Sequence, residues 1–145
     1  MRNPNERQVV VAYWSLRVAL GVVPIVAGLD KFTNLLADWP GYLSPSAVRL
    51  LPMSPGAFMH VVGVVEVVVG AAILLGYARI FGWVAMAWLA GIALELLTTG
   101  RFLDVAARDA VLAVAAFSLA RLAELTERTD AAETTTKGVS ATVRS

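Results

Sequence analysis

Long runs of apolar residues with few polar interruptions dominate the chain between residues 9 and 123. A helix needs about 20 apolar residues to cross the hydrocarbon core of a bilayer. Runs of about that length predict four transmembrane helices, near residues 9–32, 58–76, 80–98 and 105–123. A helix of a soluble bundle would carry a polar stripe, whereas residues 61–75 show only Glu66 and glycines among aliphatic side chains. The pattern therefore predicts an all-α protein, an integral membrane bundle of four transmembrane helices.

The connections between these runs differ in length. Only residues 77–79 join the second run to the third, which predicts an antiparallel helical hairpin with close backbones at the turn. The loop at residues 33–57 mixes aromatic and aliphatic residues with prolines, and we interpret it either as a connector at the membrane interface or as a lid over an opening between helices. Residues 126–145 lack apolar periodicity and are predicted to form a disordered cytoplasmic tail, so the membrane domain covers residues 1–125.

Composition supports the membrane prediction and excludes several functions. The chain has 145 residues, of which 58% are hydrophobic and 16% charged, and its mean hydropathy is +0.70. A formal net charge of +1 gives no basic surface for nucleic acid. The absence of cysteine and the single histidine exclude disulfides, thiolate metal sites and bis-histidine haem within the chain. No catalytic motif and no metal-binding cluster is recognised, so the sequence identifies no catalytic residue, no metal site and no covalent cofactor.

The distribution of basic residues predicts an orientation. More of them flank the side that holds the amino terminus and the ends of the second and fourth runs than the opposite side. The positive-inside rule therefore predicts that both termini are cytoplasmic.

Charged side chains inside apolar runs are costly unless they are buried and paired, so each is a candidate functional residue. Glu66 lies near the middle of the second run and Arg17 at a similar depth in the first, which predicts an ion pair between them. Glu95 and Asp109 are predicted to share the positive charges of nearby basic residues, which are Arg108, Lys31 or Arg101. The full candidate set is Arg17, Asp30, Lys31, His60, Glu66, Glu95, Arg108 and Asp109.

These charges have two interpretations. They could form buried ion pairs that only fix the register of the helices. They could also line a polar cavity that opens outward, in which a carboxylate relays protons or binds the head of an amphiphile such as a quinone or a lipid. Pro24, between Gly21 and Gly28, predicts a kink that would free a carbonyl near such a cavity.

Short motifs along these runs resemble the DoxX-like family of small four-helix membrane proteins. They are Leu16-Arg17-Val18-Ala19-Leu20-Gly21, Gly28-Leu29-Asp30-Lys31-Phe32, Gly63-Val64-Val65-Glu66 followed by Gly70, and Ala107-Arg108-Asp109. The resemblance covers residues 9–125 and implies a multi-pass protein of the bacterial cytoplasmic membrane. It also implies that the family's polar signature falls on Arg17, Asp30, Lys31, Glu66, Arg108 and Asp109.

Members of this family include the small subunit of a thiosulfate:quinone oxidoreductase and subunits associated with membrane redox complexes. The resemblance therefore implies a bound quinone and redox subunits as partners. A related branch often ends in a cysteine-bearing segment. This chain contains no cysteine, so the resemblance does not imply thiol chemistry for it.

The leading hypothesis is an accessory or anchoring subunit of a quinone-linked redox complex, embedded in the lipid bilayer. Two alternatives remain open, a small proton-coupled transporter and an assembly factor for another membrane complex. Glycine-lined helix faces also make a homo-oligomer plausible.

Overall fold

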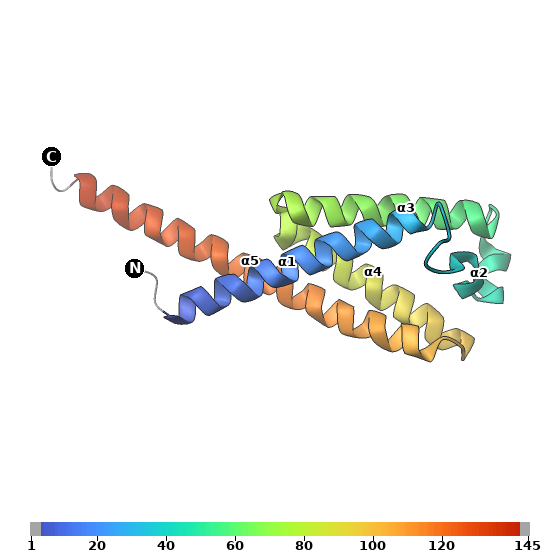
Figure 1. Cartoon of the computed structure of the whole chain (residues 1–145). Helices are drawn as coiled ribbons and strands as arrows, with labels where there is room; N and C mark the ends of the chain where they lie inside the picture. The colour runs from blue at the N-terminus through green and yellow to red at the C-terminus, as the bar shows by residue number, and fades with distance from the viewer. Residues whose placement is uncertain (1–3, 143–145) are drawn as a thin grey trace.

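The computed structural model describes residues 4–142, almost all of them helical. Within this range the long helices are α1 (Pro4–Asp30), α3 (Pro55–Ala72), α4 (Ala78–Thr99) and α5 (Leu103–Thr142). The short helices η1 (Trp39–Tyr42) and α2 (Pro45–Leu50) lie between α1 and α3, and a wide turn, η2 (Ile73–Tyr77), joins α3 to α4. The prediction of an all-α fold is confirmed. We call the end of the bundle that carries η1 and α2 the loop end, and the end that carries η2 the turn end (Figure 1).

Helices α1 and α3 form one antiparallel pair, held at close distance by glycines. A Cβ atom at Gly28 would lie 2.5 Å from the carbonyl oxygen of Gly63, and a Cβ at Gly63 would lie 2.5 Å from the carbonyl oxygen of Gly28. Gly21 and Gly70 face each other in a similar way, seven residues or about two helical turns away along each helix. Small residues allow this approach of two backbones, and the glycines therefore fix the register of α1 against α3.

Helices α4 and α5 form the second pair and pack along much of their length. A Cβ at Gly82 would lie 2.9 Å from the Cβ of Ala120, so this contact also depends on small residues. The two pairs meet in an apolar core at the turn end, where Ile73, Ala116 and Leu119 are fully buried. Toward the loop end the α1/α3 pair and the α4/α5 pair diverge (Figure 1).

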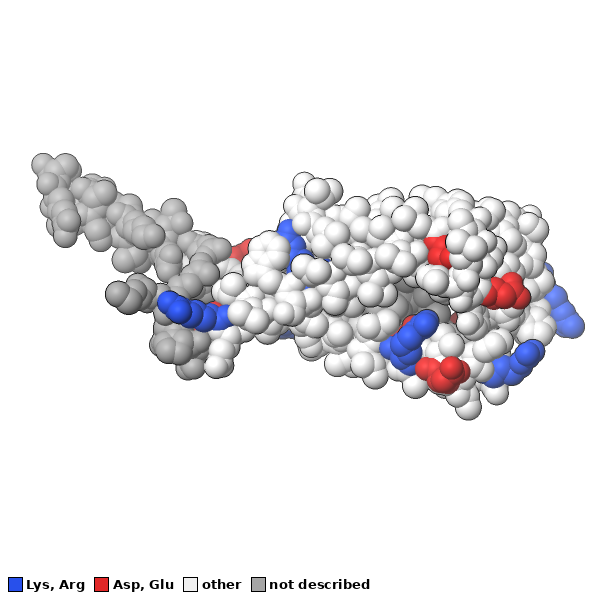
Figure 2. Space-filling model, viewed as in Figure 1, with Lys and Arg blue, Asp and Glu red and all other residues white. Residues whose placement is uncertain are grey.

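Two helical stretches of the described chain are long and apolar enough to cross a membrane by length and composition. They are Glu6–Asp30 and Pro55–Thr99, the second of which includes α3, η2 and α4. Helix α5 carries charged residues at its start and again from Arg121 onward. On the face shown in Figure 2 the bundle is largely uncharged along its middle, and charged side chains gather toward its ends.

The carboxyl-terminal segment differs from the sequence prediction. Residues 126–145 were expected to be disordered, but residues 126–142 continue α5 as a helix to Thr142, and residues 143–145 lie outside the described residues. Alanine, glutamate and lysine have high helix propensity, and no proline interrupts the segment, so it can extend a helix that packing has already nucleated.

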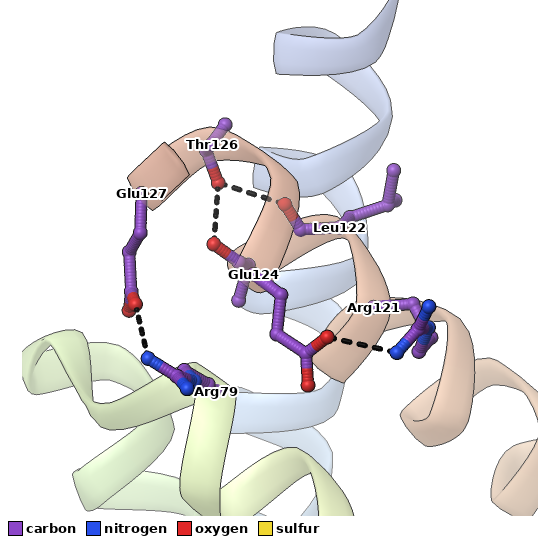
Figure 3. A network of polar contacts seen from close by, with 7 residues as sticks. Arg79, Arg121, Leu122, Glu124, Thr126 and Glu127 are labelled. Atoms are coloured by element: carbon purple, nitrogen blue, oxygen red, sulfur yellow. Dashed lines mark hydrogen bonds and ion pairs between the residues drawn. The ribbon is translucent and has the colours of Figure 1, made fainter. Parts of the chain in front are cut away.

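Polar contacts mark the turn end of the second pair (Figure 3). Arg79 at the start of α4 donates to Glu127 of α5 at 3.0 Å, and Arg121 donates to Glu124 at 2.8 Å. Both arginine side chains are more than half exposed, and exposed pairs contribute only about 0–1 kcal/mol. These contacts therefore contribute little to the stability of the fold. They lie where the apolar surface of α5 ends.

Candidate functional site

A cavity of about 460 Å³ lies between the two helix pairs, on the loop-end side of the core. Its walls are mostly apolar and include Leu20, Val62, Val69 and Leu89. Its volume falls within the range of about 300–1,000 Å³ that is typical of small-molecule sites. One face of the molecule is hollowed near the loop end, with charged side chains beside the hollow (Figure 2).

An ion pair lies in the cavity wall between α1 and α3. Lys31 Nζ donates to Glu66 Oε2 at 2.6 Å, and only 4% and 13% of these side chains are exposed. The ammonium group also lies 3.6 Å from the ring centroid of Trp39, in cation–π geometry. Lys31 is therefore held between a carboxylate and an aromatic face.

A second carboxylate lies on the opposite wall. Asp109 of α5 is buried, and its Oδ1 accepts from Arg108 Nε at 2.9 Å. The Arg108 side chain is 56% exposed and lies at the rim of the cavity. Of the three basic residues expected to pair with Glu95 and Asp109, the structure places Arg108 against Asp109.

Trp88 of α4 supplies a hydrogen-bond donor without an acceptor. Its indole Nε1 is buried in the cavity wall near Glu66 and has no hydrogen-bond partner among the described residues. A buried donor left unpaired costs about 1–3 kcal/mol, which an acceptor on a ligand would recover. Trp88 was not among the site residues predicted from the sequence, although its helical spacing from Gly91 and Glu95 placed it on the same face.

The loop between α1 and α3 covers the cavity at the loop end. Residues of η1, α2 and the adjoining segments line it, namely Trp39, Tyr42, Leu43, Ala47 and Leu51. The backbone N–H of Ser44 donates to Glu95 of α4 at 3.1 Å. Tyr42 also meets Phe102, in the turn between α4 and α5, with ring centroids 4.8 Å apart. This geometry agrees with the interpretation of the loop as a lid. Glu95 was predicted to pair with a basic residue, but its carboxylate accepts from the backbone of the lid instead.

Asp30 positions the lid and does not line the cavity. Its carboxylate accepts from Trp39 Nε1 at 2.7 Å, from the Leu36 N–H at 3.1 Å and from the Thr33 hydroxyl at 3.0 Å. The side chain is buried at the end of α1, where the chain turns into the loop. The structure therefore gives Asp30 a role in loop folding that its charge alone did not reveal.

The predicted ion pair between Arg17 and Glu66 is wrong. Arg17 instead donates to the carbonyl oxygens of Ile73 and Leu74 at 2.9 and 2.7 Å. The glycine register of α1 against α3 places Arg17 opposite η2, where the widened turn leaves carbonyls to be satisfied. Lys31 takes the place of Arg17 because helical side chains point back toward the amino terminus, which brings its ammonium group to the level of Glu66.

His60 also lies outside the cavity. Its ring is exposed and stacks on Phe32 with centroids 4.9 Å apart. The structure therefore brings together Lys31, Glu66, Glu95, Arg108 and Asp109 around the cavity, and places Arg17, Asp30 and His60 elsewhere. Among the described residues, no group of histidine, aspartate and glutamate side chains could hold a metal ion.

Comparison with known proteins identifies the family. The family model described as DoxX matches residues 12–120, which include most of the core, the lid and the whole polar set around the cavity. No curated protein and no solved structure matches the chain. Since the match covers most of the chain, the protein belongs to the DoxX family of membrane proteins.

Proposed function

We propose that this protein is an accessory or anchoring subunit of a quinone-linked redox complex, with a cavity that binds the polar head of a quinone or a lipid. In this proposal α1, α3, α4 and the first part of α5 cross the bacterial cytoplasmic membrane, and both termini lie in the cytoplasm. The observation that carries the proposal is the combination of an apolar cavity with a polar group of Lys31, Glu66, Trp88 and Asp109.

The residues of the cavity fit a quinone head group in both redox states. Trp88 Nε1–H and the Lys31 ammonium group can donate hydrogen bonds to carbonyl oxygens. The carboxylates of Glu66 and Asp109 can accept hydrogen bonds from hydroxyl groups. A quinone bound there would accept electrons and protons from a partner redox subunit, while the chain itself binds, orients and shields the head group.

The shape of the cavity supports an amphiphile over a small polar solute. Most lining residues are apolar, and the charged residues among them are Lys31, Glu66, Glu95, Arg108 and Asp109. A transported ion would need a polar path through to the turn end, which is filled by the apolar core of Ile73, Ala116 and Leu119. The described residues thus favour binding of an amphiphile over transport.

Native mass spectrometry of the protein gently extracted from its own membranes tests this proposal, together with quinone and lipid analysis of the same sample. We expect a stoichiometric quinone or lipid, or a redox subunit that remains bound. Trp88→Phe removes the indole N–H donor near Glu66 while both members of the ion pair stay in place, and is expected to lower the bound quinone about tenfold, a loss of about 1.4 kcal/mol. Arg79→Gln, far from the cavity at the turn end, is the matched control and should leave it unchanged.

A bare protein with bulk phospholipid only would contradict the proposal. The transporter alternative would then be tested by pH-dependent proton flux into liposomes with wild type and Asp109→Asn.

A further inference from the structure

Two residues of α4 belong to the cavity wall and to the outer surface at once. Ala87 and Gly91 line the cavity and are also exposed. On a helical projection they lie across α4 from Gly82, which faces Ala120 of α5. They therefore lie on the side of α4 that is turned toward α3.

Few contacts join α3 and α4 on this side of the cavity. Helices α3 and α4 join at η2 and make few contacts beyond it. A Cβ at Gly91 would meet no other atom within 4 Å. The side of the cavity toward α3 and α4 is therefore bordered by the smallest side chains and crossed by few helix contacts.

The other ways out of the cavity are less suited to an apolar chain. At the loop end the lid is tied to α4 by Glu95 and to α1 by Asp30. On the α1/α5 side the rim carries the guanidinium group of Arg108, which is 56% exposed although it pairs with Asp109. Burying a hydrocarbon chain against a charged group is unfavourable, so the uncharged rim at Ala87 and Gly91 is the favoured route.

From this geometry we infer that Ala87 and Gly91 form a lateral opening to the bilayer, through which the apolar tail of the bound amphiphile leaves the cavity. This inference rests on the proposed function. A cavity of 460 Å³ holds a head group and the start of a tail, so a longer chain must extend beyond it. The ligand class is therefore a membrane-dissolved amphiphile with a long tail, which enters sideways from the lipid.

Native mass spectrometry with defined probes tests the opening, using decylubiquinone, the same quinone head group without a tail, and lysophosphatidylcholine. In Gly91→Leu a larger side chain narrows the opening without a clash in the fold. The matched control is Gly56→Leu, because a Cβ at Gly56 also meets nothing within 4 Å and Gly56 does not line the cavity. Thermal unfolding verifies that both variants are folded.

We expect Gly91→Leu to weaken binding of whichever tailed probe the wild type takes by about tenfold or more, equivalent to about 1.4 kcal/mol. Binding of the tail-free head group should not change, and Gly56→Leu should bind every probe as the wild type does. Equal binding of the tailed probe by Gly91→Leu and wild type would overturn the lateral opening. Equal loss of tailed and tail-free probes would overturn it too, because the introduced leucine side chain would then be filling the cavity itself.

Wild-type protein that takes none of the probes would contradict the proposed function instead. Binding of decylubiquinone identifies a quinone as the ligand, and binding of lysophosphatidylcholine alone identifies a lipid.

Discussion

The ion pair between Lys31 and Glu66 predicts strong energetic coupling between α1 and α3. Its atoms are 2.6 Å apart and both side chains are largely buried. Removing one partner from a buried pair costs about 3–5 kcal/mol, because the other charge stays buried without compensation. In Lys31→Met that charge is Glu66, which also faces the negative charge of Asp109. Replacing both partners with apolar residues of similar size is often close to neutral.

If the effects of Lys31→Met and Glu66→Leu were additive, the free energy of unfolding would fall by about 6–10 kcal/mol in the double variant. We expect the double variant to lose no more of this free energy than either single variant does. The coupling energy should be about 3 kcal/mol or more. The cation–π contact of Lys31 with Trp39 is lost from both the single and the double variant, so it cancels in the cycle. Reversible unfolding in mixed detergent micelles, followed by circular dichroism, measures each free energy of unfolding.

Arg17→Leu combined with Glu66→Leu is the matched control cycle. Because Arg17 bonds to the carbonyls of η2 and not to Glu66, this pair should be additive within about 0.5 kcal/mol. Additivity for Lys31 and Glu66, with coupling for Arg17 and Glu66, would refute the assignment of the ion pair.

Further expectations concern the helix register, the turn and the lid. Gly63→Ala should lower the free energy of unfolding by about 1–3 kcal/mol, because its Cβ would lie 2.5 Å from the Gly28 carbonyl oxygen. Gly91→Ala should raise the free energy of unfolding by about 0.5–1 kcal/mol through helix propensity, because a Cβ there meets no other atom within 4 Å. Thermal unfolding of the two variants compares these effects, and equal effects would contradict the close packing at Gly63. Arg17→Leu should speed amide hydrogen exchange in residues 73–80, because the η2 carbonyls lose their donors, and unchanged exchange there would argue against that role. Asp30→Asn should speed exchange in residues 31–44 with η2 unaffected, whereas intact protection of the loop would show that the carboxylate does not hold it.

The helices and their order could be predicted from the sequence because apolar run length reports directly on long helices. The antiparallel turn at residues 77–79 was also predictable, since so short a connection reverses the chain direction. The sequence did not reveal that α3 packs on α1 and α4 on α5, while α3 and α4 make few contacts beyond η2. The widened turn η2 was not predictable, because it depends on Gly76 adopting a φ of 119° in the folded chain.

The partners of the charged residues were harder to predict. Depth along a helix suggested Arg17 for Glu66, but the true register is set by glycine contacts between α1 and α3, which hydropathy does not report. A sequence pattern that paired Gly21 with Gly70 and Gly28 with Gly63 would have placed Lys31 near Glu66. Asp30 and Glu95 were found by their charge, whereas their use of backbone N–H groups in the loop required the structure.

The glycine contacts inside each helix pair have an evolutionary consequence. The pairs are held by small residues such as Gly63 and Gly82, whereas the cavity is lined by different side chains, among them Phe58 and Ile92. Substitutions at Phe58 or Ile92 therefore leave the glycine contacts within each pair intact, whereas Lys31 and Glu66 belong both to the cavity and to the contact between α1 and α3. Ligand preference can diverge at such apolar positions while the helix register stays the same.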